Sequence, residues 1–85
     1  MPKTKQHKVK CRRFYLLRKE DESGVSGTGI VAEGVEFDSG MCALSFTSSY
    51  QHVNVYANMH ALEAVHGHGG KTEVVFVDKD KGVKF

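Results

Sequence analysis

Apolar and polar residues alternate along several short segments of this chain, a pattern that predicts β-strands. In the first segment, residues 12–19, Phe14 and Leu16 would lie on one face and Tyr15 and Leu17 on the other. A strand that is apolar on both faces suits a central position in a sheet or a place in a closed barrel. Further strands are expected at 29–37, 41–47, 52–57 and 71–78.

The second and third expected strands form a hairpin, because Asp38-Ser39-Gly40 between them has good turn chemistry. Strict alternation in the second strand would direct Glu33 into the core. A bulge at Glu33-Gly34 removes this conflict, since glycine tolerates the bulged conformation. The core face of the hairpin would then comprise Ile30, Ala32, Val35 and Phe37 with Cys42, Leu44 and Phe46.

The fourth expected strand alternates Val53 and Val55 with His52, Asn54 and Tyr56, which predicts a half-buried strand. A short helix follows over Met59–His66. Asn58 is a good N-cap for it, and Gly67 is expected to end it in the left-handed conformation.

Five strands with one short helix before the last predict a mainly β domain. The order of elements is typical of a small five-stranded SH3-like barrel or a strongly twisted antiparallel sheet. Closure into a barrel would remove exposed strand edges, an advantage for so small a sheet. An OB-like barrel fits less well, because its helix normally falls between the third and fourth strands. An open sheet with the helix on one face is the remaining alternative.

Eighty-five residues suffice for one domain. We expect a disordered basic arm at 1–10, a single β-rich domain at 11–78 and a polar C-terminal tail at 79–85. No apolar run approaches the roughly 18 residues of a membrane span, so a cytoplasmic protein without membrane contact is expected. Cys11 and Cys42 are expected to be free thiols, since neither belongs to a CxxC pair.

Positive charge is concentrated at the N-terminus. Residues 1–13 contain six basic and no acidic side chains, a net +6, whereas the remaining 72 residues contain six basic and ten acidic ones, a net −4. The basic residues of this arm are Lys3, Lys5, Lys8, Lys10, Arg12 and Arg13. Such an arm either stays solvated or contacts nucleic acid or an acidic protein surface. No aromatic residue precedes Phe14, so stacking on bases is not indicated.

Histidine and glycine alternate at the end of the segment 58–70, NMHALEAVHGHGG. A metal site from Glu63, His66 and His68 is one interpretation, although the spacing is poor for converging ligands. Backbone N–H groups of 67–70 with Lys71 would instead bind an anion, against the unfavourable dipole of a helix C-terminus. The third interpretation is purely structural, with His66 packed on the apolar face of the helix. The candidate binding surface combines this loop with the loop at 24–29, and comprises Ser26, Gly27, Thr28, His66, His68 and Lys71.

Catalytic signatures are absent from the sequence: it contains no nucleophile elbow, HExxH or paired-carboxylate pattern. The segment SGVSGTG is rich in glycine but lacks the lysine of a Walker motif. We therefore expect a protein that is not an enzyme and needs no cofactor.

Two blocks together, SGVSGTGIVAEGVEFDSG and HALEAVHGHGGKTEVVFVD, resemble small uncharacterised proteins from bacterial genomes and their phages. The resemblance covers roughly residues 23–78 and implies a phage or prophage accessory protein, with no activity to carry over. Together with the pattern, it suggests a small non-catalytic interaction module. Its partner would be a host or phage protein, with nucleic acid contacted through residues 1–13 as an alternative.

Overall fold

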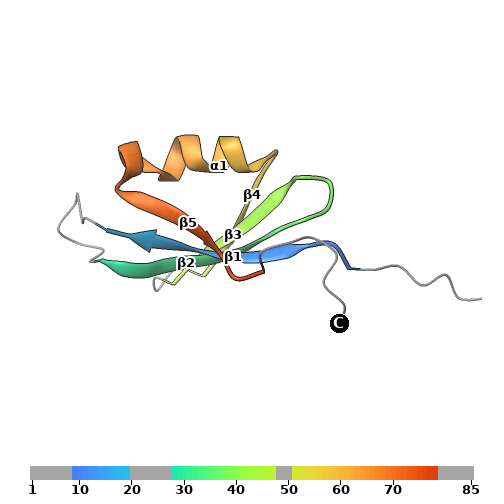
Figure 1. Cartoon of the computed structure of the whole chain (residues 1–85), viewed down its shortest axis with the longest axis horizontal. Coiled ribbons are helices and arrows are strands. Elements are labelled where there is room, and N and C mark those ends of the chain that lie inside the picture. Colours follow the sequence, from blue (N-terminus) through green and yellow to red (C-terminus); the bar gives the residue numbers. More distant parts are fainter. Residues whose placement is uncertain (1–8, 20–27, 48–50, 79–85) are drawn as a thin grey trace, which may run out of the picture.

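The computed structural model describes residues 9–19, 28–47 and 51–78 (Figure 1). They form five strands, one α-helix and one 3-10 turn. In chain order these are β1 (Arg12–Arg18), β2 (Gly29–Glu36), β3 (Cys42–Phe46), β4 (Val53–Tyr56), α1 (Met59–His66), η1 (His68–Gly70) and β5 (Thr72–Phe76). The predicted hairpin, the helix and its position before the last strand are all confirmed.

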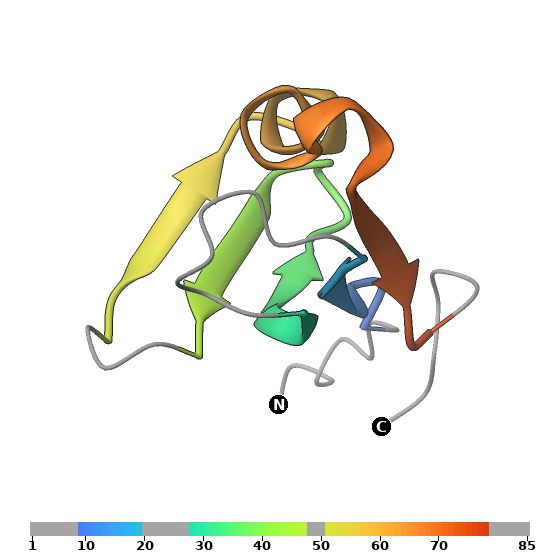
Figure 2. The same cartoon turned by 90° about the vertical axis from the view of Figure 1, so that its left-hand side faces the viewer.

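The strands form one antiparallel sheet in the order β4-β3-β2-β1-β5. β1 pairs with both β2 and β5, which confirms its predicted central position. The chain then leaves β4 at one edge, passes through α1 and η1, and returns as β5 at the opposite edge. Figure 2 shows α1 lying over one face of the sheet, between these two edge strands.

The predicted closed SH3-like barrel is wrong, because β4 and β5 do not pair with each other in the part of the chain that the structure describes. A helix lies where barrel closure would have brought the two edges together. Leu62 of α1 is fully buried and supplies apolar cover that a barrel would have obtained from its opposite wall. The fold is thus the open-sheet alternative, with the helix on one face.

The core lies between α1 and the sheet. Its buried residues are Phe14, Leu16, Val31, Ala32, Cys42, Leu44 and Leu62, with Phe46, Tyr56, Met59, Val74 and Phe76 packed around them. The predicted core positions Ala32, Cys42, Leu44 and Phe46 are therefore confirmed. Both cysteines are free thiols, as predicted; Cys42 is buried and Cys11 half-buried.

The bulge in β2 lies at Val31 and not at Glu33-Gly34, where it was predicted. Leu16 of β1 pairs with Ala32 while Leu17 pairs with Ile30, so Val31 is the extra residue. Gly34 keeps regular pairing opposite Phe14 and is required for a different reason. A Cβ atom there would lie 2.6 Å from Cζ of the Phe14 ring, which packs directly across this position.

This shift of the bulge changes which face each residue occupies. Glu36 pairs with Arg12 and faces α1, where it is buried. Ile30 and Phe37, predicted to lie in the core, are 58 % and 46 % exposed, and Val35 is only partly buried. Those three core assignments were wrong because side chains alternate between the two faces of a strand, and a bulge at a different position shifts that alternation by one residue.

Local signals placed α1 correctly. The Oδ1 atom of Asn58 accepts a hydrogen bond of 2.8 Å from the N–H of Ala61, which confirms the N-cap. Gly67 follows the helix but keeps right-handed geometry (φ −70°), contrary to the prediction. Its N–H bonds to the Glu63 carbonyl oxygen, which would lie 2.6 Å from a Cβ at this position. The left-handed turn comes later, at Gly69 and Gly70.

Candidate functional site

The face of the sheet opposite α1 is covered by no other element within residues 9–19, 28–47 and 51–78. Strand register arranges its side chains in two rows across all five strands. From β4 to β5, the first row is Val55, Ala43, Val35, Arg13 and Val77, and the second is Val53, Ser45, Glu33, Tyr15 and Val75. We call these two rows, with Ile30, the open face.

Large aliphatic side chains are exposed on the open face. Val53 is 62 % exposed, Val55 61 %, Ile30 58 % and Val77 53 %. The fourth strand is half-buried as predicted, but Asn54 and Tyr56 form its less exposed face, and the valines lie on the exposed one. Isolated exposed apolar residues are ordinary, but a contiguous group on one face marks an interaction surface.

A hollow of about 550 Å³ lies on the open face. Ala43 and Ser45 of β3 have small side chains, so the surface is low there, between Val53 on one side and Tyr15 on the other. Because the hollow is open to solvent, it suits contact with a protein side chain or strand more than an enclosed small-molecule site does.

One carboxylate lies in the middle of this apolar surface. Glu33 is exposed, between Tyr15 of β1 and Ser45 of β3. In the described part of the chain its side chain makes no hydrogen bond or ion pair, whereas Glu36 and Glu73 are both in ion pairs. Glu33 therefore presents a free negative charge to whatever contacts the open face.

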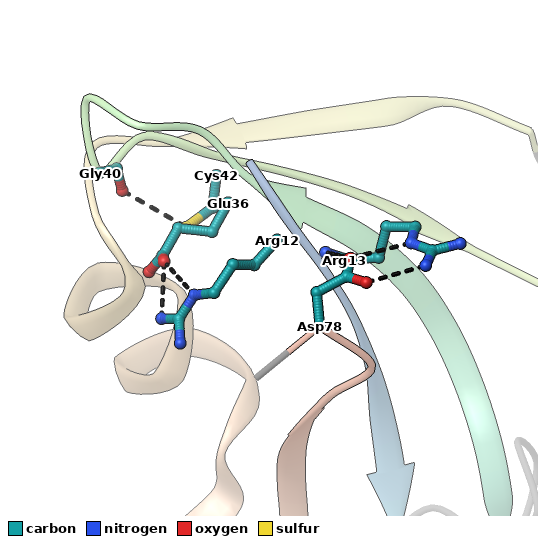
Figure 3. Close-up of polar contacts among 6 residues, drawn as sticks. All are labelled: Arg12, Arg13, Glu36, Gly40, Cys42 and Asp78. Carbon is teal, nitrogen blue, oxygen red and sulfur yellow. Dashed lines mark hydrogen bonds and ion pairs between the residues drawn. The ribbon is translucent and has the colours of Figure 1, made fainter. Parts of the chain in front are cut away.

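Arg12 and Arg13 extend to opposite sides of β1 and each binds an acidic residue (Figure 3). On the helix side, Arg12 donates from Nε and Nη2 to Glu36 Oε1 at 3.0 and 2.7 Å. Its guanidinium also lies 3.8 Å from the centroid of the Phe76 ring. The ion pair joins β1 to β2, and the ring contact joins β1 to β5, so Arg12 stabilises the sheet.

On the other side of β1, Arg13 forms a bidentate ion pair with Asp78. Nε and Nη2 donate to Oδ2 and Oδ1 at 2.9 and 2.8 Å, and the backbone N–H of Arg13 donates to Oδ2 at 2.9 Å. The hydrogen bonds from the Arg13 side chain, followed by the one from its backbone, lower the pKa of Asp78 to about 2. Asp78 thus fastens the end of β5 to the centre of the sheet.

These pairs bear on the predicted nucleic-acid contacts. Arg12 and Arg13 are engaged within the fold, and Lys10 is exposed just before β1. Lys3, Lys5 and Lys8 lie outside the described residues. The structure therefore gives the two arginines of the basic arm an architectural role.

His66, the last residue of α1, packs against side chains of the sheet. Its Nε2 atom lies 2.5 Å from the Tyr56 hydroxyl oxygen, and its ring centroid is 5.1 Å from that of Phe46. This is the structural interpretation of His66. The interaction connects α1 to β4 and to β3.

The other predicted surface residues are only partly brought together. Arg18 pairs with both Gly29 and Thr72, so the adjacent Thr28 and Lys71 lie at the same end of the sheet. Ser26 and Gly27 lie outside the described residues. Glu63 is exposed on α1, and no three His, Cys, Asp or Glu side chains among the described residues gather as metal ligands.

A second hollow adjoins this end of the sheet, beside Gly67, Gly69 and Gly70. The Lys19–Glu73 ion pair, with an Nζ–Oε2 distance of 3.3 Å, flanks it. The hydroxyl of Thr72 is buried there without a hydrogen-bond partner in the described structure. Glu63 also lines this hollow, but no cluster of metal ligands forms among the described residues.

Comparison with known proteins identifies the family. The family model described as Acb5 phage protein matches residues 11–78, well over half of the chain. The chain belongs to the Acb5 phage protein family. This confirms the resemblance to phage proteins, and the family description specifies no activity. No curated protein and no solved structure matches the chain.

For this Acb5 family chain, the sequence alone did not reveal the open face. Its valines alternate with polar residues in the same way as core residues do, and the pattern does not say which side a helix will cover. The one available signal was β1, where Tyr15 and Leu17 add a second apolar face.

Among the described residues, none of the helices has the length and apolar character of a membrane span.

Proposed function

We propose that this phage protein is a small non-catalytic interaction module whose open face docks a partner protein. The observation that carries the proposal is the group of exposed aliphatic side chains, Val53, Val55, Ile30 and Val77, beside the hollow over Ala43 and Ser45. Transfer of such side chains out of water is favourable, at roughly 25 cal/mol per Å² of apolar surface. A docked protein would supply the cover that α1 gives the other face.

The dimensions of the open face suit a protein. Five strands about 4.8 Å apart and two to three rows about 6.7 Å apart span on the order of 24 by 15–20 Å. Side chains that stand above this area add to the surface that contact removes from water. The flat area is about half of the roughly 800 Å² that each partner buries in a standard interface, so the open face suits a small interface.

Charge defines the chemistry of the partner. Glu33 would become an unpaired buried carboxylate unless the partner brings a cation to it, and such burial is costly. A second copy of this chain docked face to face near Glu33 would bring two carboxylates together. We therefore propose a different protein, from the host or the phage, that presents an apolar surface with a lysine or arginine positioned opposite Glu33.

Site-specific photo-cross-linking tests this function. A photoreactive amino acid at Ser45, within the hollow, is compared with one at Val65, which is 58 % exposed on α1. After irradiation in lysate of phage-infected cells, we expect a discrete cross-linked protein from position 45 but not from position 65. Glu33→Lys should reduce that product about tenfold or more, as loss of a central charge pair does. Equal products from both positions, or none from position 45, would refute the proposal.

A further inference from the structure

The two edges of the sheet differ in how they are protected. β5 carries Glu73, which pairs with Lys19, and is followed by Asp78, which pairs with Arg13. β4 consists of Val53, Asn54, Val55 and Tyr56, without a charge, a proline or a bulge. Such devices normally keep an edge strand from pairing with another chain. β4 therefore presents a free edge within the described structure.

Hydrogen-bond alternation shows which backbone groups of β4 face outward. Two backbone hydrogen bonds join odd-numbered residues at the ends of the β2–β3 pair: Phe37 N–H donates to the Met41 oxygen, and Thr47 N–H donates to the Val31 oxygen. The odd-numbered residues of β3 are therefore the ones whose backbone groups bond to β2. Even-numbered residues of β3 therefore face β4, where Leu44 lies opposite Asn54. Asn54 and Tyr56 bond to β3, so Val53 and Val55 direct their N–H and C=O groups away from the sheet.

These outward groups fit a second copy of the same strand. In an antiparallel pair of two β4 strands, residues directly opposite each other lie on the same face of the sheet. Odd-numbered residues of β4 lie on the open face and even-numbered ones on the helix face, so an odd residue must pair with an odd one and an even residue with an even one. Pairing Val53 with Val55 of the second copy, and the reverse, satisfies this rule. It forms four backbone hydrogen bonds, places valine against valine on the open face, and sets Asn54 opposite itself at the axis. A register one step further would need Ala57, beyond the end of β4.

We infer that the β4 edge is a self-association site, where two copies of this chain join β4 to β4 in antiparallel pairing and form one continuous ten-stranded sheet. The absence of charge on β4 removes repulsion at the axis, and cross-strand valine pairs add stabilisation. This inference goes beyond the proposed function, because it uses the edge of the sheet and a second copy. It leaves both open faces available and places them side by side.

Proline at an outward-facing position tests the backbone pairing. Val55→Pro removes an N–H that the monomer does not use, so an edge strand tolerates it, and circular dichroism should show a folded chain. In the dimer the same change deletes two of four hydrogen bonds. Sedimentation equilibrium of the full chain should show a dimer, about tenfold or more weaker for Val55→Pro. Val55→Thr keeps the N–H and should change the dimer dissociation constant less.

A cysteine at the axis provides a second test, which holds even if the proline variant unfolds. Opposite residues of a non-hydrogen-bonded antiparallel pair have Cα atoms about 4.5 Å apart, within the range of a disulfide. In a Cys11→Ser background, Asn54→Cys should form a covalent dimer under mild oxidant. His52→Cys, which would not face its own copy, should form far less of it.

Three results would overturn the inference: a monomer at every concentration, equal cross-linking at positions 52 and 54, or a dimer that Glu33→Lys abolishes and Val55→Pro leaves intact. The last result would place self-association on the open face. The two proposals can fail separately. If no partner protein docks on the open face, the cross-link from position 45 is absent while the β4 dimer is still observed.

Discussion

Gly34 shows how one small residue shapes both sides of this sheet. On the helix side the Phe14 ring packs across it, with Cζ 2.6 Å from the position that a Cβ would take. On the open face its backbone lines the hollow beside Ala43 and Ser45. The glycine is therefore required by packing and not by a turn or a bulge.

Gly34→Ala should destabilise the domain by about 1–3 kcal/mol, because the added methyl group forces the Phe14 ring to move. In a domain of this size about 1 kcal/mol corresponds to a fall of about 4–8 °C in Tm, measured by thermal unfolding. Phe14→Leu in the same chain should recover part of the loss, a non-additive effect expected of residues in contact. Strict additivity of the two substitutions would contradict the packing described here.

Asp78 makes stability depend on acid pH. Its pKa is lowered from 3.8 to about 2 in the folded chain by the hydrogen bonds from Arg13. A carboxylate with a depressed folded pKa contributes stability that is fully present above its unfolded pKa and is lost as pH falls through its folded pKa. The contribution of Asp78 should therefore decline between about pH 4 and about pH 2.

The comparison of the wild-type chain with Asp78→Asn tests this dependence. The variant should be less stable at neutral pH, and the difference in unfolding free energy should narrow as pH falls from 4 towards 2. Denaturant unfolding at several pH values supplies the measurement. A difference that stays constant across this range would show that the Arg13 pair does not lower the pKa of Asp78.

At the scale of elements, α1 has one fully buried side chain. An isolated helix of eight residues is marginal in water, so packing must stabilise it. Leu62 is the buried residue of α1, fully enclosed between the helix and the sheet. The Tyr56–His66 interaction adds a polar contact at the C-terminal end.

Leu62→Ala should cost about 2–5 kcal/mol, as leucine truncation does in a closed core. Val65→Ala is the matched control, since Val65 is 58 % exposed on the same helix and its truncation should change stability by no more than about 0.5 kcal/mol. Both effects are measured by denaturant unfolding. Similar losses for the two variants would mean that α1 does not pack through Leu62.

Element positions were predictable from the sequence because their signals are local. Asn58 and the Asp38-Ser39-Gly40 turn gave α1 and the β2–β3 hairpin their positions, and β1 revealed its central place through two apolar faces. The bulge was not predictable, because Val31 becomes the extra residue only through the register with Leu16 and Leu17 on another strand. The displacement of the bulge from Glu33-Gly34 to Val31 reversed the expected faces of Ile30, Val35 and Phe37.

The candidate site was harder to predict than the fold. Histidine and glycine drew attention to the loop after α1, yet His66 proves to be a packing residue between Tyr56 and Phe46. Val53 and Val55 gave no distinguishing signal, because exposure of a strand face depends on where a distant helix lies. Only the path of α1 from the β4 edge to the β5 edge decides which face is covered.

At the scale of the whole molecule, one helix covers one face of a five-stranded sheet in the described part of the chain. Small domains usually cannot leave much apolar surface uncovered, since they bury only about 60 % of the surface of the unfolded chain. An open face lined by valines is therefore expected to serve contact with another protein. Its exposure is the claim on which the proposed function depends.

Methyl NMR of the full chain with a soluble paramagnetic agent tests that claim most directly. The methyl signals of Val53, Val55 and Ile30 should broaden as strongly as that of exposed Val65, while those of Leu16, Leu44 and Leu62 stay protected. Protection of the Val53 and Val55 methyl groups equal to that of Leu44 would contradict the account, because another part of the chain would then cover the open face.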